Sequence, residues 1–90
     1  MRYTVDYDKK ARKQLDKMDP PVRKRIYDWI DEHLEGCEDP TMWGKPLTNN
    51  LKGYWSYRVN DYRIIAEILD DKVLIIITEV GHRREIYKEI

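Results

Sequence analysis

The sequence predicts an α+β fold in which a small antiparallel β-sheet carries two N-terminal helices packed on one face, in the order β-α-α-β-β-β, with a short C-terminal helical tail. Two observations predict this class. The first 36 residues contain two apolar stripes at helical spacing, separated by a break at Pro20-Pro21. The second half contains apolar strand patterns separated by two-residue turn signals at Asn60-Asp61 and Asp70-Asp71. Ninety residues suffice for one hydrophobic core, so we expect a single domain over residues 1–90.

The composition is that of a soluble globular protein with a polar surface. Hydrophobic residues make up 41% of the chain and charged residues 38%. No apolar run approaches the roughly 18 residues that indicate a membrane span, and the residues after Met1 do not resemble a signal peptide. We therefore expect a cytoplasmic protein that does not associate with a membrane.

The charge balance argues against one class of function but leaves a local exception. Seventeen basic and 17 acidic residues give a net charge of zero, which counts against binding nucleic acid by bulk charge. Residues 41–60, however, contain three basic residues and no acidic residue. A basic patch in this segment is therefore compatible with the neutral total.

The single cysteine, Cys37, excludes an internal disulfide and has no metal-ligand spacing to His33 or His82. We expect it to be an ordinary loop thiol. The sequence also lacks a glycine-rich phosphate loop and any Ser/His/Asp or Cys/His arrangement for nucleophilic catalysis. We therefore expect neither a metal nor a cofactor.

The N-terminal segment is predicted to form a strand and then a helix. Residues 2–7 alternate and are rich in strand-forming residues, with Tyr3, Val5 and Tyr7 directed inward. Asp8 can cap the helix that follows. The apolar stripe of this helix consists of Ala11, Leu15 and Met18.

The rest of that helix is basic, and two interpretations of it are open. The basic side chains are Lys9, Lys10, Arg12, Lys13 and Lys17. In one interpretation they form an ordinary solvated helix face. In the other they form a docking surface for RNA on the ribosome, because lysine and arginine neutralise phosphate charge.

A second helix is predicted to begin after Asp19, which can act as the N-cap, because proline suits the first helical turn. Gly36 is expected to end this helix as a C-cap. The residues that recur at helical spacing between these limits are Val22, Ile26, Trp29, Ile30, His33 and Leu34. His33 borders the apolar stripe, so we expect a packed residue rather than a ligand.

Residues 37–53 form a long connection, and long connections in compact domains are often functional or folded over the surface. The residues expected to anchor this connection are Met42, Trp43, Leu47 and Leu51. For Trp43 a second interpretation is open, in which the ring stacks on a nucleic-acid base. We favour the anchor.

Residues 53–63 are predicted to contain a tight hairpin that turns at Asn60-Asp61, because both turn residues tolerate a left-handed backbone. In this register Arg58 lies directly opposite Arg63. Side chains alternate between the two faces of a strand, so both arginines lie on the face opposite to Tyr57. Two guanidinium groups with Cβ atoms about 5 Å apart are unfavourable for stability, whereas an anionic ligand would favour them.

After the hairpin, residues 64–69 are expected to lead through a two-residue turn at Asp70-Asp71 into a central strand over residues 72–80. The near-continuous apolar run in that last strand predicts its central position. A two-residue turn places Thr78 opposite Arg63. His82 lies four residues further along the strand, so its side chain is expected on the same face as that of Thr78.

This topology is expected to gather polar residues where the last strand ends beside the hairpin turn. The set is Arg58, Arg63, His82, Arg83 and Tyr87. RNA cleavage without a metal needs a base for the ribose 2′-OH, an acid for the leaving 5′-oxygen and cations for the phosphate charge. Histidine and arginine can supply these functions. The alternative is a surface cluster of hydrated arginines beside an unrelated histidine.

Four segments together resemble the RelE/ParE toxin superfamily, specifically its RelE-like branch, over nearly the whole chain. They are residues 45–47, 51–55, 57–64 and 80–87. The resemblance implies a toxin of a type II toxin–antitoxin pair. Such a toxin enters the ribosomal A site, contacts 16S rRNA, and cuts mRNA without a metal, leaving a 2′,3′-cyclic phosphate. It also implies a cognate RelB-like antitoxin that wraps the toxin and blocks it.

The resemblance carries site residues over one at a time. Arg63 matches the arginine that stabilises the scissile phosphate, and Arg83 matches a phosphate contact or acid near the last strand. Tyr87 matches the C-terminal tyrosine, with a shorter spacing from Arg83 than in the best-known member. His82 is expected to carry the proton, as a nearby histidine does in YoeB-like toxins.

This chain departs from the family pattern at three positions. The catalytic lysines of the best-known member fall here at Tyr54 and Ser56. The residues expected to bind RNA or phosphate are Arg58, Lys45 and Lys52, of which Lys45 aligns with a catalytic glutamate of the YoeB branch.

Two functions from different classes remain open. The first is a ribosome-dependent mRNA endonuclease. The second is a ParE-like toxin that inhibits DNA gyrase by binding, without cutting RNA. Both share the expected fold. The set of Arg63, His82, Arg83 and Tyr87 favours the nuclease, because a protein that only binds has no chemical need to assemble it.

Overall fold

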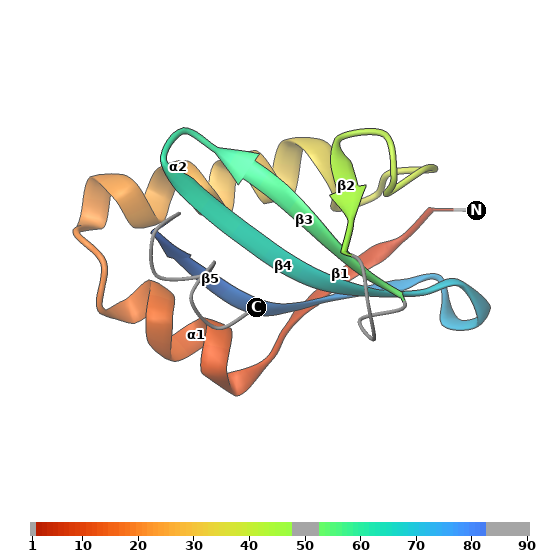
Figure 1. Ribbon diagram of the computed structural model, residues 1–90, viewed down its shortest axis with the longest axis horizontal. Helices are drawn as coiled ribbons and strands as arrows, with labels where there is room; N and C mark the ends of the chain where they lie inside the picture. The colour runs from red at the N-terminus through yellow and green to blue at the C-terminus, as the bar shows by residue number, and fades with distance from the viewer. Residues whose placement is uncertain (1, 48–52, 83–90) are drawn as a thin grey trace.

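The α+β fold is confirmed by the computed structural model, which describes residues 2–47 and 53–82 (Figure 1). Its elements are β1 (Thr4–Tyr7), α1 (Lys9–Asp16), α2 (Pro20–His33), β2 (Gly44–Pro46), β3 (Tyr54–Val59), β4 (Tyr62–Leu69), a 3-10 turn (Asp70–Lys72) and β5 (Leu74–His82). Three predicted features lie outside the described residues: the C-terminal helical tail with Arg83 and Tyr87, and the side chains of Leu51 and Lys52. Neither helix in the described part of the chain has the length and apolar character to cross a membrane.

The five strands form one sheet in the order β1-β5-β4-β3-β2. The apolar strand β5 is an interior strand, as predicted, between β1 and β4, and β4 is the middle strand of the five. The sheet contains two features that the sequence did not reveal. One is the short edge strand β2, and the other is the parallel pairing of β1 with β5, which makes the sheet mixed. A three-residue strand carries too little periodicity to be seen, and the choice of parallel partner depends on tertiary packing.

Both helices pack on one face of the sheet, as predicted, because they share a single apolar core with its strands. The helices contribute Ala11, Leu15, Ile26, Ile30 and Leu34. The sheet contributes Tyr57, Val59, Ile64, Ala66, Ile75, Ile77 and Val80. The opposite face of the sheet is therefore the one that neither helix covers.

The predicted helix caps can be compared with the observed ends of the two helices. Asp8 accepts a hydrogen bond from the Lys9 backbone N–H at 2.8 Å, so the predicted N-cap of α1 is confirmed. Asp19 occupies the N-cap position of α2, but its side chain makes no capping hydrogen bond within the described residues. The two prolines that follow Asp19 have no N–H to offer. The predicted C-cap at Gly36 is wrong, because α2 ends at His33 with Leu34 as its C-cap. Gly36 does have the left-handed φ of 76°, but it lies in the turn after the helix, where its N–H donates to the Tyr3 carbonyl at 2.8 Å.

The predicted two-residue turn at Asp70-Asp71 is wrong. Four residues connect Leu69 to Leu74, namely the 3-10 turn and Val73, whose backbone is left-handed at φ 51° and ψ 48°. Two extra residues in the turn shift the register between β4 and β5 by two and leave every side chain on its predicted face.

A β-bulge adds a further shift of one residue. Ala66 pairs with Ile77, whereas Ile65 pairs with Glu79, so Thr78 is the extra residue of β5. The Thr78 hydroxyl donates to the Ile65 carbonyl at 3.1 Å. The predicted pair of Thr78 with Arg63 is therefore wrong. A one-residue shift also moves the following side chains to the other face of the sheet.

Candidate functional site: a basic groove on the helix-free face

The centre of the candidate site is a pair of arginines on the β3–β4 hairpin. Arg58 and Arg63 are direct partners across the two strands, as predicted. The turn between them begins at Asn60, which has φ of 55°. Because Tyr57 and Ile64 beside them belong to the core, alternation directs both arginines to the helix-free face. Arg58 is exposed and Arg63 is half-buried.

Strand β2 adds Lys45 to this face. Lys45 pairs with Ser56, which lies two residues before Arg58 on the same face of β3. This pairing depends on the neighbouring Gly44. A Cβ atom at Gly44 would lie 2.7 Å from the Ser56 carbonyl oxygen and 2.7 Å from ring carbons of Tyr57. Only glycine allows β2 to approach β3 so closely.

These residues enclose a groove of about 550 Å³, which we call the basic groove. Its lining residues are Met42, Trp43, Gly44, Lys45, Pro46, Leu47, Ser56, Arg58 and Arg63. Three of them are cationic, and no carboxylate is present among the described residues that line it. Such a surface suits a phosphate group, because arginine and lysine form charge-assisted hydrogen bonds with phosphate oxygens.

The connection that borders the groove is held differently from the prediction. Met42 and Trp43 were expected to anchor it, but 66% and 52% of their surfaces are exposed. The anchor prediction is therefore wrong for Met42. For Trp43 it holds only in part, because the ring meets His33 edge-on at a centroid distance of 4.9 Å.

The connection is instead fastened by Tyr57, whose hydroxyl donates to the Pro40 carbonyl at 2.6 Å. Both residues are buried. Burial raises the pKa of the Tyr57 phenol well above its ordinary value, so the hydroxyl stays protonated and keeps donating. The sequence signals a phenol at this position but does not reveal its partner, which lies 17 residues away.

His33 is a packed residue, as predicted. Its ring stacks on Trp29 at 4.5 Å with an interplanar angle of 18°, and its Nδ1 lies 2.9 Å from the Trp29 carbonyl oxygen. A carbonyl can only accept, so Nδ1 carries a proton. Trp29, His33 and Trp43 thus form a continuous aromatic row from α2 to the rim of the basic groove.

His82 does not lie on the face that carries the arginines. Arg63 pairs with Gly81 and Tyr62 pairs with His82, so His82 shares the face of Tyr62. The two rings meet edge-on at 5.6 Å. His82 lines a separate groove of about 480 Å³, whose other residues are Gln14, Lys17, Met18, Asp19, Tyr62, Val80 and Gly81. His82 lies at the end of the sheet where it was predicted, beside the hairpin turn. It lies on the wrong face, however, because the bulge at Thr78 turns it to the side of the helices.

The basic helix α1 is exposed along the predicted residues Lys9, Lys10, Arg12, Lys13 and Lys17. Two of these side chains have local contacts. Lys10 forms an ion pair with Glu79 at 3.2 Å, and the Arg12 guanidinium lies 5.8 Å from the centroid of the Tyr7 ring. Lys9, Lys13 and Lys17 are therefore the better candidates for an external anion.

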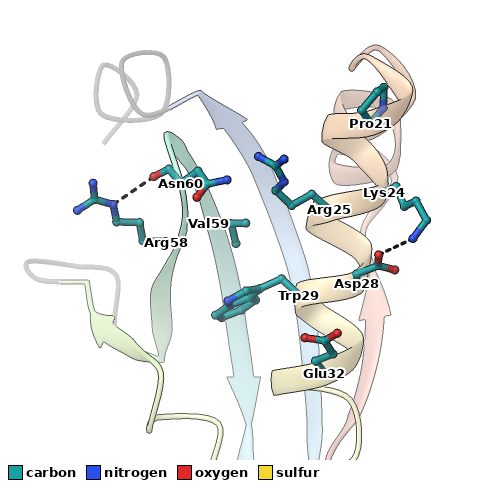
Figure 2. A pocket seen from close by; sticks show the side chains of 9 residues that line it. All are labelled: Pro21, Lys24, Arg25, Asp28, Trp29, Glu32, Arg58, Val59 and Asn60. Carbon is teal, nitrogen blue, oxygen red and sulfur yellow. Dashed lines mark hydrogen bonds and ion pairs between the residues drawn. The ribbon is translucent and has the colours of Figure 1, made fainter.

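A further groove of about 520 Å³, which sequence reasoning missed, lies between α2 and the tip of the hairpin (Figure 2). Figure 2 shows Arg58 on the far side of the hairpin from α2, with its Nε donating to the Asn60 carbonyl at 3.1 Å. The helix contributes the carboxylates of Asp28 and Glu32 to this groove. Its charges are mixed, and Asp28 is paired with Lys24 at 2.7 Å, so it suits phosphate less well than the basic groove.

Within residues 2–47 and 53–82, no group of three or more His, Cys, Asp or Glu side chains is arranged to hold a metal ion. Cys37 is a free, half-buried thiol, in keeping with the expected loop thiol. Burial raises its pKa, which keeps it in the less reactive thiol form.

Comparison with known proteins identifies the family. Residues 5–87 match the ParE toxin family of type II toxin–antitoxin systems (parDE). The chain is 33% identical over 88 residues to Toxin RelG of Mycobacterium tuberculosis, covering 98% of this chain and 99% of that protein. It is 30% identical over 93 residues to the mRNA interferase toxin RelE of Escherichia coli, covering 99% and 94% respectively.

The fold is shared as well. The structure resembles that of the toxin–antitoxin complex RelBE2 from Mycobacterium tuberculosis, with a TM-score of 0.82, 31% identity, and coverage of 92% of this chain and 93% of that one. The family match, the two sequence relatives and the fold agree with one another. The chain belongs to the RelE/ParE superfamily of toxins from type II toxin–antitoxin systems, on its RelE-like side.

Proposed function

We propose that this toxin is a ribosome-dependent mRNA endonuclease that cuts in the A site. The observation that carries the proposal is the direct pairing of Arg58 with Arg63 in a groove whose described lining has three cations and no carboxylate. Like charges opposite each other destabilise a sheet slightly, so an anionic ligand accounts for the pair better than stability does. The similarity to an mRNA interferase toxin of Escherichia coli supports RNA as that ligand.

The proposed reaction is an internal transfer at one phosphate. The ribose 2′-oxygen attacks phosphorus while a base takes its proton. The bond from phosphorus to the 5′-oxygen breaks, and an acid returns a proton to that oxygen. The products are a 2′,3′-cyclic phosphate and a 5′-hydroxyl. Arg63, with assistance from Arg58, stabilises the negative charge that develops on phosphate, so the scheme invokes no metal ion.

The proton carriers are proposed from the resemblance and from the sheet topology. His82 ends β5 beside Tyr62, so it lies at the same end of the sheet as Arg63 but on the other face. Because the two residues lie on opposite faces, the scheme requires the substrate to bend around this end of the sheet, so that His82 reaches a phosphate bound at Arg63. Arg83 is proposed as a phosphate contact or acid and Tyr87 as a residue that positions the nucleotide. Lys45 and Lys52 are both proposed to bind RNA.

The proposed partners are the ribosome and a RelB-like antitoxin. Solved relatives with this fold are described as complexes of RelE with RelB, including one from Methanococcus jannaschii at 28% identity. An acidic antitoxin segment could neutralise the basic groove and exclude RNA from it. The exposed basic side of α1 is proposed to dock on 16S rRNA, which would place the toxin in the cytoplasm.

Two observations favour the second candidate, a toxin that inhibits DNA gyrase by binding. The family match over residues 5–87 is described as a ParE toxin. In addition, Tyr54 and Ser56 stand where the best-known RNA-cutting member has catalytic lysines. This candidate needs no groove for a scissile phosphate, which is why we place it second.

Two assays separate the candidates. The first maps the 5′ ends of cellular mRNA by primer extension after brief expression of the toxin without an antitoxin. The nuclease predicts new ends inside codons of translated messages, and none in messages that lack a start codon. The second measures supercoiling by purified gyrase in the presence of the toxin. Inhibited gyrase together with intact mRNA would replace the first candidate by the second.

A further inference from the structure

Trp43 is a large aromatic residue at the rim of the basic groove, where its contact with His33 leaves it exposed. It is 52% exposed and, with Met42, is one of two large hydrophobic residues exposed among those that the structure describes. Exposure alone does not indicate function, because single apolar side chains are common on protein surfaces. An exposed tryptophan next to cationic side chains is, however, the arrangement by which proteins bind unpaired bases.

The position of Trp43 relative to the arginines follows from strand register. Gly44 pairs with Tyr57, so one further step of the same antiparallel register brings Trp43 beside Arg58. Both side chains line the basic groove. The groove volume of about 550 Å³ lies within the range that holds small ligands. The lining thus combines an aromatic ring with two arginines, which match the base and the phosphate of a nucleotide.

The ring is also held in place before any ligand arrives. His33 meets it edge-on, and His33 is itself fixed by stacking on Trp29 and by its contact with the Trp29 carbonyl. The hydrogen bond from Tyr57 to Pro40 fastens the start of the same connection. A preorganised stacking surface loses less conformational freedom on binding than a mobile one does.

The other grooves lack this combination. The groove beside α2 contains Trp29, but it also contains the carboxylates of Asp28 and Glu32. The groove beside His82 contains Asp19, and the aromatic ring of Tyr62 there is in contact with His82. Only the basic groove, of the three, combines an exposed aromatic ring with an all-cationic charged lining.

We propose that Trp43 is the base-stacking platform of the basic groove: an unpaired RNA base stacks on its ring while the adjoining phosphate binds Arg58 and Arg63. This inference rests on the proposed function and names the part of the site that holds the nucleotide. Stacking depends on ring area and is tolerant of sequence. The platform therefore favours purines over pyrimidines at that nucleotide without selecting a single base.

The test uses the isolated full-length chain and a trinucleotide with 2′-O-methyl groups. Because its 2′-oxygens are blocked, this RNA binds but cannot be cut. The chain has three tryptophans, whose indole N–H groups give separate NMR signals, and Trp43→Phe identifies the one from Trp43. We expect RNA to shift the Trp43 signal and to leave Trp29 and Trp55 nearly unchanged. Shifts of all three signals alike, or of none, would overturn the proposal.

A matched pair of substitutions isolates the aromatic ring. Trp43→Leu keeps a large apolar side chain, whereas Trp43→Phe also keeps an aromatic face. We expect Trp43→Leu to weaken binding of the trinucleotide about tenfold, and Trp43→Phe to retain most of the affinity. Equal affinities of Trp43→Leu and the unsubstituted chain would contradict a stacking role. Circular dichroism verifies that each variant is folded.

Cleavage assays on the same variants separate this inference from the proposed function. If the unsubstituted chain cuts ribosome-bound mRNA and Trp43→Leu cuts and binds equally well, the platform is wrong and the nuclease stands. If the NMR and affinity results hold but no variant cuts mRNA, the platform stands and the nuclease is wrong.

Discussion

Arg63 in β4 lies directly opposite Gly81 in β5, and this pairing places the next residue, His82, on the other face of the sheet. Had Thr78 been an ordinary ladder residue, His82 would have shared the face of Arg63. The bulge at Thr78 therefore separates the best candidate for proton transfer from the best candidate for phosphate binding. Bulges that redirect a side chain beside a functional site are common in sheets.

The role of His82 in proton transfer can be measured directly, although it lies on the face opposite to Arg63. If it carries a proton around the open end of the sheet, His82→Ala should lower the single-turnover rate of A-site cleavage by about 10²–10⁴. His82→Gln keeps a polar side chain of similar size and should be equally impaired. Rates within threefold of the unsubstituted toxin for both variants would mean that another group transfers the proton.

Gly44 is predicted to be indispensable for the wall that β2 contributes. In Gly44→Ala the new Cβ would lie 2.7 Å from the Ser56 carbonyl oxygen and the Tyr57 ring, so β2 must move away from β3. We expect the free energy of unfolding to fall by about 2–3 kcal/mol, as measured by urea denaturation. Lys45→Ala, one residue further along β2, serves as the control and should change it by less than about 0.5 kcal/mol. Equal stabilities for the two variants would show that β2 is not held against β3.

Val73 should limit the stability of the fold. Its left-handed backbone, at φ 51° and ψ 48°, is unfavourable for a β-branched residue. Asparagine tolerates this conformation better, so Val73→Asn should raise the free energy of unfolding by about 1 kcal/mol. The control is Lys72→Asn in the adjoining 3-10 turn, where no such gain is expected. A loss of stability in Val73→Asn would argue against the left-handed conformation.

Ribosome docking can be tested with charge reversals on α1. Lys13 and Lys17 are exposed, whereas Lys10 already pairs with Glu79. The double variant Lys13→Glu/Lys17→Glu should weaken association with ribosomes by roughly tenfold and reduce its dependence on salt. Ribosome co-sedimentation at several salt concentrations measures both effects.

The control for this experiment is Lys24→Glu/Arg25→Glu on α2, which changes the net charge equally on a different surface. It should associate with ribosomes nearly as well as the unsubstituted toxin does. If both double variants lose affinity to the same extent, the effect is one of net charge and α1 has no special role.

Local signals in the sequence predicted the parts of the fold that depend on a few neighbouring residues. The asparagine at position 60 adopts the left-handed backbone that its turn requires, and the register of Arg58 with Arg63 follows directly. Asp8 acts as the N-cap of α1 for the same reason. The arginine pair at the centre of the candidate site could thus be predicted from a single turn.

The remainder depends on contacts between distant segments. A bulge at Thr78 has no local signature, yet one inserted residue reverses the face of His82. The strand containing Gly44 has only three residues, which is too few to show a period, so the sequence did not predict it. The exposure of Trp43 follows from how β2 docks on β3, which the sequence of residues 37–53 does not specify.

The most direct test of the account is single-turnover cleavage of mRNA in the ribosomal A site by Arg63→Ala. Arg25→Ala is the matched control, because it removes an exposed arginine of α2 that does not line the basic groove. Circular dichroism confirms that both variants are folded. Loss of one charge contact to the transition state predicts a rate about 10²–10³ lower for Arg63→Ala, with Arg25→Ala close to the unsubstituted toxin. A folded Arg63→Ala variant that cuts at the unsubstituted rate would contradict the assignment of the basic groove as the active site.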